Sequence, residues 1–172
     1  MSPATLAQRL GSLLSTRDLT LCTAESCTGG LLADTITDTP GSSRYFLGSL
    51  VAYSNAAKTK LLNVPTSYLK TFGAVSAPVA IAMARGALGL FGADVALAIT
   101  GIAGPTAENR TADVPGGGTQ DKPVGLTYIS IVAHRQAACM RFVWPHSRRG
   151  NKEASALAAL SLALRVLAEP NM

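Results

Sequence analysis

The sequence predicts an α/β fold, in which a mixed sheet of about five strands carries helices on both faces. Helical and strand patterns alternate along most of the chain, and such alternation is typical of a layered sheet. The last two strand patterns follow each other closely, as in a hairpin, so the sheet must include antiparallel pairing. Hydrophobic residues make up 48% of the 172 residues and aromatic residues only 5%, so we expect a core of Ala, Leu and Val.

The first half of the chain contains two strand patterns, each followed by helical patterns. Leucines form one apolar stripe after Pro3, which predicts the first helix. Pro40-Gly41 is a breaker and ends the second helix. The expected elements are a helix over 3–16, strand one over 19–24, a helix over about 28–37, strand two over 48–53, and short helices that open at Asn55 and Thr66.

The second half begins with the best helix in the middle of the chain. Ser76 is a suitable N-cap and Pro78 falls in the first turn. The next run is almost continuously apolar, which suggests a central strand covered on both faces. The expected elements are a helix over 76–91, strand three over 93–100, a long loop over 101–122, strands over 124–133 and 138–144, and a last helix over about 151–168.

Charge and cysteine content exclude several classes of protein. The net charge is +5, and the charges are scattered, without the basic runs of a nucleic-acid tail, so we expect no nucleic-acid partner. Three cysteines without paired spacing argue against a disulfide framework or a zinc site. The N-terminal residues show no basic region followed by an apolar stretch, and no apolar run approaches about 18 residues, so we expect neither a signal peptide nor a membrane span. We therefore expect a cytoplasmic protein without a membrane partner.

Gly- or Ser-rich turns follow strands one, two and three. The first, at 26–30, turns a strand into a helix, whose free N–H groups favour negative charge. The others lie at 53–55 and 100–104. Ligands bind outside the carboxyl ends of strands in such sheets, so we expect a site where the three turns meet.

The residues that could carry chemistry indicate a serine–lysine pair rather than a metal or a triad. The chain has only two histidines, neither at metal-ligand spacing, and no G-x-S-x-G elbow. Lys58 is the best candidate base, because a desolvated lysine loses its proton near neutral pH. Ser26 and Ser43 are both candidate nucleophiles, with Cys27 a third. Each also has a structural interpretation, as a helix cap, a turn residue and an apolar filler respectively.

Two further segments offer groups that bind anions. The glycines at 116–118 present backbone N–H groups, as does Thr100-Gly101. Basic residues at 146–152 precede or open the last helix, where a phosphate would be favoured.

Six ordered motifs together resemble the C-terminal domain of the CinA family, known as the nicotinamide mononucleotide deamidase family. These are A-E-S-C-T-G-G at 24–30, G-S-S at 41–43, Y-S-N-A-A-K at 53–58, G-A-V-S at 73–76, T-G-I-A-G-P at 100–105 and G-G-G-T-Q-D-K-P-V-G at 116–125. The resemblance covers nearly the whole chain and implies one domain over 1–172, folded as a three-layer α/β/α sandwich. Larger CinA proteins carry an additional N-terminal domain, which we do not expect in a chain that starts so close to the first motif.

The resemblance also implies a reaction, the hydrolysis of nicotinamide mononucleotide (NMN) to nicotinate mononucleotide and ammonia. It implies no metal and no cofactor, a small nucleotide as the partner, and a homo-oligomer. The catalytic positions that it implies are Ser26, Ser43, Tyr53 and Lys58. The expected substrate-binding positions are Cys27, Thr28, Gly29, Thr100, Gly101, Gly104, Gly117 and Lys152.

The sequence departs from the family pattern at two places near the expected pocket. Family members usually have Gly-Asp-Arg and a further Arg at the start of the last helix, where this chain has Gly150-Asn151-Lys152 and Ala156. Arg148 or Arg149 could compensate. Residues 106–115 also separate segments that are commonly adjacent. The alternative is therefore a non-catalytic nucleotide-binding or regulatory module that retains the pocket.

Overall fold

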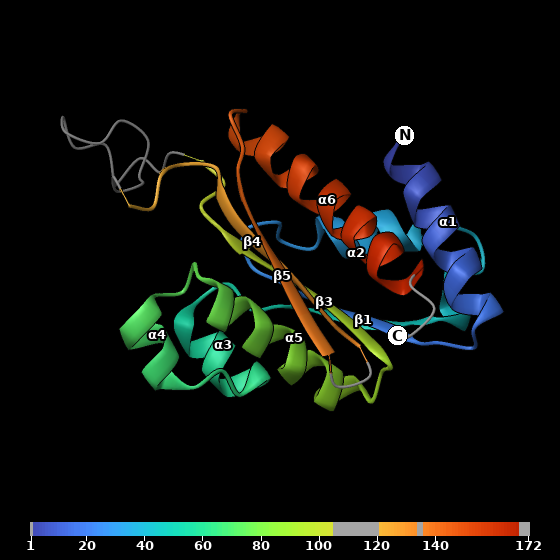
Figure 1. Cartoon of the computed structure of the whole chain (residues 1–172), viewed down its shortest axis with the longest axis horizontal. Helices are drawn as coiled ribbons and strands as arrows, with labels where there is room; N and C mark the ends of the chain where they lie inside the picture. Colours follow the sequence, from blue (N-terminus) through green and yellow to red (C-terminus); the bar gives the residue numbers. More distant parts are fainter. Residues whose placement is uncertain (1, 105–120, 134–135, 169–172) are drawn as a thin grey trace.

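A five-stranded mixed sheet organises the chain (Figure 1). The computed structural model describes residues 2–104, 121–133 and 136–168. Within these residues the strand order is β2-β1-β3-β4-β5. The strands are β1 (Leu21–Glu25), β2 (Phe46–Val51), β3 (Val95–Gly101), β4 (Leu126–Ala133) and β5 (Gln136–Val143).

The strand directions follow the order of the chain. β1 lies at the centre of three parallel strands, between β2 and β3. β4 pairs antiparallel with β3, and β5 pairs antiparallel with β4. The mixed sheet and the closing strand pair are therefore confirmed. All five residues of β1 are buried, as are the first six of β3, because helices cover both faces of these strands.

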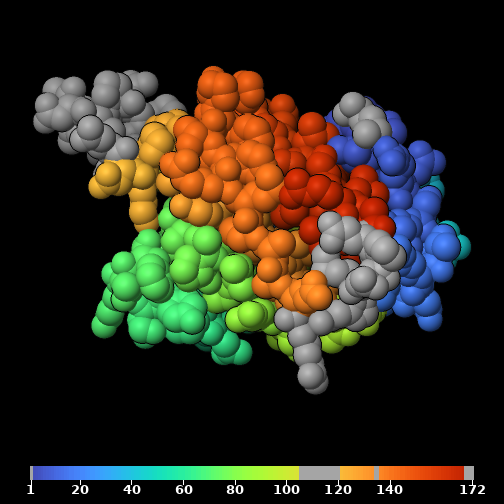
Figure 2. Space-filling view, viewed as in Figure 1, coloured from blue at the N-terminus to red at the C-terminus, as the bar shows by residue number. Residues whose placement is uncertain are grey.

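The helices form one layer on each face of the sheet. α1, α2 and α6 pack together on one face, while α5 covers the other face and carries α3 and α4 (Figure 1). Figure 2 shows the edge strand β5 at the surface between these two layers. The predicted three-layer α/β/α sandwich is thus confirmed. The α-helices are α1 (Pro3–Thr16), α2 (Leu31–Thr37), α3 (Asn55–Leu62), α4 (Thr66–Phe72), α5 (Ala77–Phe91) and α6 (Arg148–Ala168), and a 3₁₀ turn, η1, covers Ser42–Arg44.

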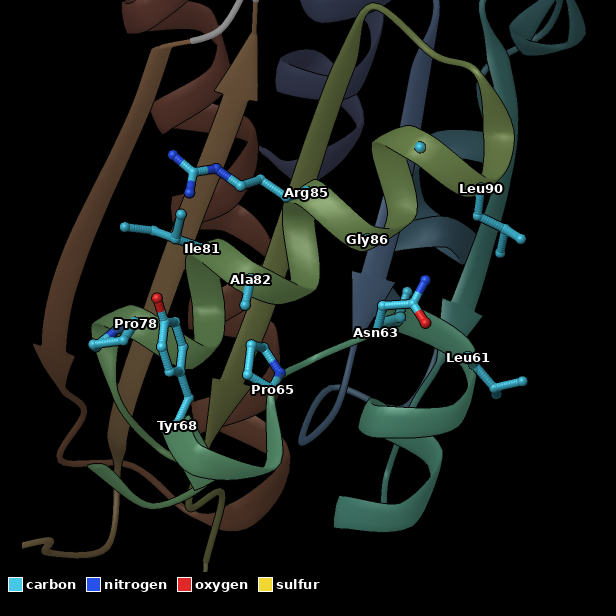
Figure 3. Close-up of a pocket in the computed structure, with 12 residues that line it drawn as sticks. Leu61, Asn63, Pro65, Tyr68, Pro78, Ile81, Ala82, Arg85, Gly86 and Leu90 are labelled. Atoms are coloured by element: carbon cyan, nitrogen blue, oxygen red, sulfur yellow. The ribbon is translucent and has the colours of Figure 1, made fainter. Parts of the chain in front are cut away.

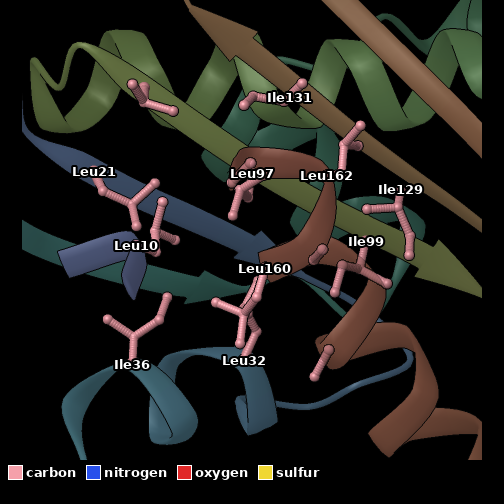
Figure 4. Packing of buried hydrophobic residues seen from close by; sticks show 14 of the residues in the cluster. Leu10, Leu21, Leu32, Ile36, Leu97, Ile99, Ile129, Ile131, Leu160 and Leu162 are labelled. Atoms are coloured by element: carbon pink, nitrogen blue, oxygen red, sulfur yellow. The ribbon is translucent and has the colours of Figure 1, made fainter. Parts of the chain in front are cut away.

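The larger of the two cores lies between the sheet and the layer of α1, α2 and α6 (Figure 4). Branched aliphatic side chains fill it, as the composition predicts. Leu10 and Leu160 come from the helices and meet Leu97 and Ile99 of β3 (Figure 4). The second core, beneath α5, is built mainly from smaller side chains. Alanines allow α5 to approach the sheet closely there.

Several element boundaries differ from the predictions for identifiable reasons. α2 begins at Leu31 rather than near 28, because Gly29 and Gly30 take left-handed conformations with φ of 64° and 97°. β2 occupies 46–51 rather than 48–53, because Val51 is its last residue paired with β1. α6 begins three residues earlier than expected, at Arg148.

Parts of two predictions fall outside the described residues. The middle of the loop expected at 101–122, with its insertion at 106–115, lies there, and so does the connection between β4 and β5. Among the helices that the structure describes, none is both long and apolar enough to cross a membrane.

Candidate active site

A small cavity opens where the carboxyl ends of β1, β2 and β3 meet, as the three turns predict. Its volume is about 260 Å³, just below the range of about 300–1,000 Å³ usual for pockets that enclose a drug-sized ligand. The cavity therefore suits a small group rather than a whole nucleotide. It is lined by Ser26, Cys27, Tyr53, Lys58, Ala74, Val75, Thr100, Gly101, Ile102, Ala103, Gly104 and Arg148.

Ser26 and Lys58 meet inside this cavity. The Nζ atom of Lys58 lies 2.9 Å from the Oγ atom of Ser26. Ser26 directly follows β1, and its N–H donates to the carbonyl of Ile99 on β3, which fixes the serine between two strands. Lys58 stands in the first turn of α3, whose N-cap Ser54 accepts a hydrogen bond from the Ala57 N–H. Backbone geometry on both sides therefore aims the two side chains at each other.

The surroundings of Lys58 disfavour its charge and orient its amine. The side chain is 1% exposed, and burial lowers its pKa below the ordinary 10.5. Nζ donates to the carbonyls of Ala52 and Tyr53 at 2.9 and 3.0 Å. Carbonyl oxygens only accept, so these two contacts hold two N–H bonds. In the neutral amine the lone pair is left for the Ser26 hydroxyl, which is the arrangement that a general base requires.

The lowered pKa has one cause, the desolvation that the sequence analysis expected. Desolvation is the whole source of the lowering, and no neighbouring basic group, Lys152 included, is among its causes. The buried thiol of Cys27 acts in the opposite direction. Burial by itself therefore biases Lys58 toward the neutral form.

Glu25 occupies the N-terminus of α2, which the sequence suggested as an anion site. Its fully buried carboxylate accepts hydrogen bonds from the N–H groups of Gly30, Leu32 and Ala33, at 2.9 to 3.1 Å. A negative charge already within the chain thus compensates the positive end of the helix. The expectation that this helix start faces a ligand is wrong.

Cys27 lies in the cavity wall but does not have the properties of a nucleophile. Its side chain is 7% exposed, and burial raises the pKa of the thiol to about 12. The start of α2 does not offset this effect, because Glu25 takes up its N–H groups and the Glu25 charge itself raises the pKa of the thiol. The thiol is therefore protonated at neutral pH. The neighbouring hydroxyl of Thr28 is fully buried and, among the described residues, has no hydrogen-bond partner.

Ser43 does not join Ser26 in the folded chain. It lies in η1, directly before β2, whereas the cavity lies beyond the end of β2. β2 has six residues, which at 3.3 Å per residue separate its two ends by about 20 Å. The expectation that Ser43 joins the other catalytic candidates is therefore wrong for residues of the same chain. The direction of β2 places Ser26 and Ser43 at opposite edges of the sheet.

Tyr53 makes two separate contacts, one to Lys58 through its backbone and one to Arg148 through its phenol. Its carbonyl accepts the Lys58 hydrogen bond, so Tyr53 orients the lysine through its main chain. The side chain is 61% exposed at the mouth of the cavity. Its hydroxyl accepts a hydrogen bond of 3.1 Å from Nη2 of Arg148.

The expected binding residues lie in three positions relative to the cavity. Thr100, Gly101 and Gly104 line it, although the Thr100 hydroxyl donates to the carbonyl of Ala74 at 2.8 Å. Gly29 and Lys152 lie next to each other beside it, because a Cβ atom on Gly29 would stand 3.6 Å from the Lys152 Nζ atom. Gly117 lies outside the described residues.

Two residues of α6 near the cavity are absent from the predicted substrate-binding positions, although the sequence named Arg148, with Arg149, as a residue that could compensate for the family's arginine. Arg148 lines the mouth, and Asn151 is buried behind it, with Nδ2 donating to the Ala103 carbonyl at 2.7 Å. A usable signal exists for Arg148, which precedes Lys152 by four residues and so shares a helix face with it. Asn151 gives no such signal, because its partner is 48 positions away.

A larger cavity of about 820 Å³ lies on the outer side of α5, against α3 and α4 (Figure 3). Its lining is largely apolar, with Tyr68 and Ile81 facing each other and Arg85 at one end (Figure 3). No serine, cysteine or lysine is among the described lining residues. The smaller cavity is therefore the better candidate for chemistry. In the described part of the chain, no cluster of three or more His, Cys, Asp or Glu side chains could hold a metal ion.

The chain that carries this site matches a known family over almost its entire length. The family model of the CinA C-terminal domain matches residues 3–167. The chain belongs to this family. A CinA-like protein of Desulfotalea psychrophila is 46% identical over 163 residues, covering 95% of this chain and 37% of that protein. The chain spans 35–38% of the length of the first curated relatives that it matches.

Solved CinA structures have the same fold over their full length. The competence/damage inducible protein CihA from Agrobacterium tumefaciens is 37% identical, with a TM-score of 0.87 and coverage of 97% of this chain and 96% of that chain. The competence damage-inducible protein A (ComA) from Klebsiella pneumoniae is 27% identical, with a TM-score of 0.90 and coverage of 99% and 100%.

Proposed function

We propose that the protein is an amidohydrolase that converts NMN and water to nicotinate mononucleotide and ammonia in the cytoplasm. The observation that carries this proposal is the buried contact of 2.9 Å between Lys58 Nζ and Ser26 Oγ. Such a pair supplies a nucleophile together with its base. Membership of the CinA family supports the choice of substrate class. The three cysteines are free thiols, which supports the cytoplasm as the location because disulfide bonds are rare there.

In the first half of the reaction, Ser26 Oγ attacks the carboxamide carbon while Lys58 takes the hydroxyl proton. Two donors remain engaged with the carbonyls of Ala52 and Tyr53, so the amine keeps its orientation as it becomes charged. Lys58 then gives the proton to the departing nitrogen, which leaves as ammonia. The C–N bond breaks and a Ser26 ester remains.

In the second half, water replaces ammonia and the same groups act again. Lys58 accepts a proton from the water, whose oxygen attacks the ester carbon. Ser26 leaves with that proton returned to it, and the carboxylic acid that forms gives its remaining proton to ammonia or solvent and becomes a carboxylate. The balance is one water consumed and one ammonia released.

The tetrahedral intermediate needs donors for its oxyanion. The N–H groups of Gly30, Leu32 and Ala33 are engaged by Glu25 and do not serve this purpose. Those of Cys27 and Thr28 directly follow the nucleophile and make no backbone hydrogen bond with other described residues. We assign the oxyanion to these two groups.

The decisive experiment is ammonia release from NMN by the purified protein. We expect turnover by the unmodified chain and none above background by Ser26→Ala, with both folded by circular dichroism. A folded protein that releases no ammonia would refute the proposed substrate. Nicotinamide riboside and nicotinamide, tested in the same assay, show which parts of the nucleotide are required.

The second candidate is a nucleotide-binding module without turnover. It rests on the departure at position 152, where the resemblance implies Arg and this chain has Lys152 beside the cavity; position 156 is 3% exposed within the core and does not bear on the cavity. Calorimetry separates the two functions. Binding of NMN without release of ammonia supports the binding module.

A further inference from the structure

We propose that the larger cavity, on the outer side of α5, is a second binding site, which takes an apolar molecule that carries one anionic group (Figure 3). The two cavities share no described lining residue, so this site is separate from the one around Ser26 and Lys58. Binding there does not depend on the proposed reaction, and it can be tested without any turnover.

The volume and lining of the larger cavity suit a small molecule with aromatic or aliphatic groups. Its volume is about 820 Å³, within the range of about 300–1,000 Å³ that is usual for ligand pockets. Leu61 of α3, Tyr68 of α4 and Leu90 of α5 line it and remain 41%, 40% and 58% exposed. Apolar surface from three helices is thus gathered around one hollow, and an apolar molecule bound there removes it from water.

Two glycines of α5 line this cavity, and packing within the chain explains only one of them. A Cβ atom on Gly86 would overlap the carbonyl oxygen of Leu62, so the close approach of α3 requires glycine there. A Cβ atom on Gly89 would meet nothing within 4 Å. Glycine is less favourable than alanine in a helix, and no contact with a described residue compensates for this at Gly89. What the missing side chain does provide is open space in the cavity.

Arg85 gives the cavity its charge. Among the described lining residues it is the only charged side chain, and none is acidic. The arginine is exposed, and its guanidinium forms no hydrogen bond or ion pair with another described residue. Its five N–H donors therefore face solvent and can bind a carboxylate or sulfonate through two parallel hydrogen bonds.

The sequence of the three surrounding helices also favours an anion. α3, α4 and α5 all lie between residues 39 and 93, a stretch that contains no aspartate or glutamate. The same stretch supplies Lys60 and Lys70, which are exposed on α3 and α4. Acids of these helices thus do not compensate the positive charge of the layer, which attracts the anionic end of a ligand toward Arg85. The apolar lining accommodates the rest of the molecule.

The first test uses two fluorescent probes that differ by one sulfonate. 8-Anilinonaphthalene-1-sulfonate (ANS) is anionic and fluoresces in apolar sites, and N-phenyl-1-naphthylamine is its neutral counterpart. For Arg85→Gln we expect the Kd of ANS to rise by at least about tenfold, because charge-assisted hydrogen bonds are lost. The Kd of the neutral probe should change by less than about twofold. Lys70→Gln removes an equal charge from the same layer outside the lining, and should leave both values unchanged.

The second test fills the cavity without disturbing the fold. Because nothing stands within 4 Å of a Cβ atom at position 89, Gly89→Leu extends into the hollow and also raises helix propensity. We expect the Kd values of both probes to rise by at least about tenfold, while the Tm stays equal or increases. Thermal unfolding of every variant checks that the probes report on the folded chain.

Three outcomes would overturn the proposal. Arg85→Gln and Lys70→Gln could weaken ANS equally, which would mean that only the general charge of the layer matters. Gly89→Leu could leave both Kd values unchanged, which would place the probes elsewhere on the chain. A second copy of the chain could cover this face, in which case the ANS bound per chain would fall as the protein concentration rises.

Discussion

The Nζ atom of Lys58 lies 2.9 Å from the Oγ atom of Ser26, although 32 positions separate the two residues. Ser26 is placed by the end of β1 and Lys58 by the start of α3, directly after β2. Parallel pairing of β1 and β2 brings these two chain ends to the same edge of the sheet. The contact thus depends on the register of two strands rather than on flexible loops, and most of the predictions below test it.

Replacing Lys58 tests whether the amine acts as a base. We expect Lys58→Gln to lower turnover by at least about a hundredfold, because general-base assistance is lost. Lys58→Arg should not restore turnover, since Arg stays protonated. Ammonia release under saturating NMN measures both. The control is Lys60→Gln, an exposed lysine on the same helix, which should be nearly silent. Near-normal turnover of Lys58→Arg would mean that position 58 supplies only positive charge.

Replacing the two serines separately tests the position of the nucleophile. Ser26→Ala should abolish turnover, because the ester intermediate cannot form. Ser43→Ala should retain turnover within about twofold, because this exposed serine lies at the other end of β2. The same ammonia assay applies to both. Equal losses in the two variants would contradict the assignment of Ser26 as sole nucleophile.

The lowered pKa of Lys58 predicts a specific dependence of stability on pH. In the unfolded chain the amine titrates near 10.5, and in the folded protein it titrates lower. Between these two pKa values the unfolded chain binds the additional proton, so the free energy of unfolding rises with pH through that window. At pH values below the folded pKa, Lys58 is charged in both states, and the free energy of unfolding is reduced by the full cost of burying that charge.

Lys58→Met removes this titration and isolates its effect. We expect the Tm of the unmodified protein, minus that of Lys58→Met, to increase as the pH rises from about 6 to about 10. The subtraction cancels other groups, including the buried thiols, whose pKa values are raised. A difference that is flat or falls with pH would show that the Lys58 pKa is not lowered.

The thiol of Cys27 should be chemically inert and dispensable for turnover. With a pKa raised to about 12, it carries almost no thiolate at neutral pH. Cys27→Ala should keep turnover within about threefold, the loss that a small packing defect in the cavity wall would cause. Alkylation by iodoacetamide, followed by mass spectrometry, should be slow at Cys27 in the folded protein. Rapid alkylation linked to loss of turnover would revive a cysteine mechanism.

Glu25 should stabilise the fold rather than take part in the reaction. Glu25→Gln removes the charge that compensates the start of α2, and we expect the free energy of unfolding to fall by about 2 kcal/mol. Urea denaturation measures this change. Asp34→Asn, an exposed acid in the same helix, is the control and should have little effect. A stable Glu25→Gln protein without turnover would instead place Glu25 in the chemistry.

The sequence by itself determined the α/β class, the hairpin and the three turns that form the cavity. These features are encoded locally, because hydrophobic periodicity selects helix or strand and glycines mark turns. It also pointed to Ser26 and Lys58, since a chain without a suitably placed histidine leaves lysine as the partner for serine. Parallel strands in such a fold then place the two residues at one edge.

Tertiary structure alone decided which polar groups reach the cavity. The direction of β2 excludes Ser43 from the cavity, because a strand about 20 Å long lies between η1 and the site. The Glu25 carboxylate occupied the start of α2, which no spacing rule distinguishes from a free helix terminus. The approach of α6 to Gly104 brought Arg148 to the mouth from 95 positions beyond Tyr53. Such contacts depend on how distant elements pack, and local sequence patterns carry no information about that packing.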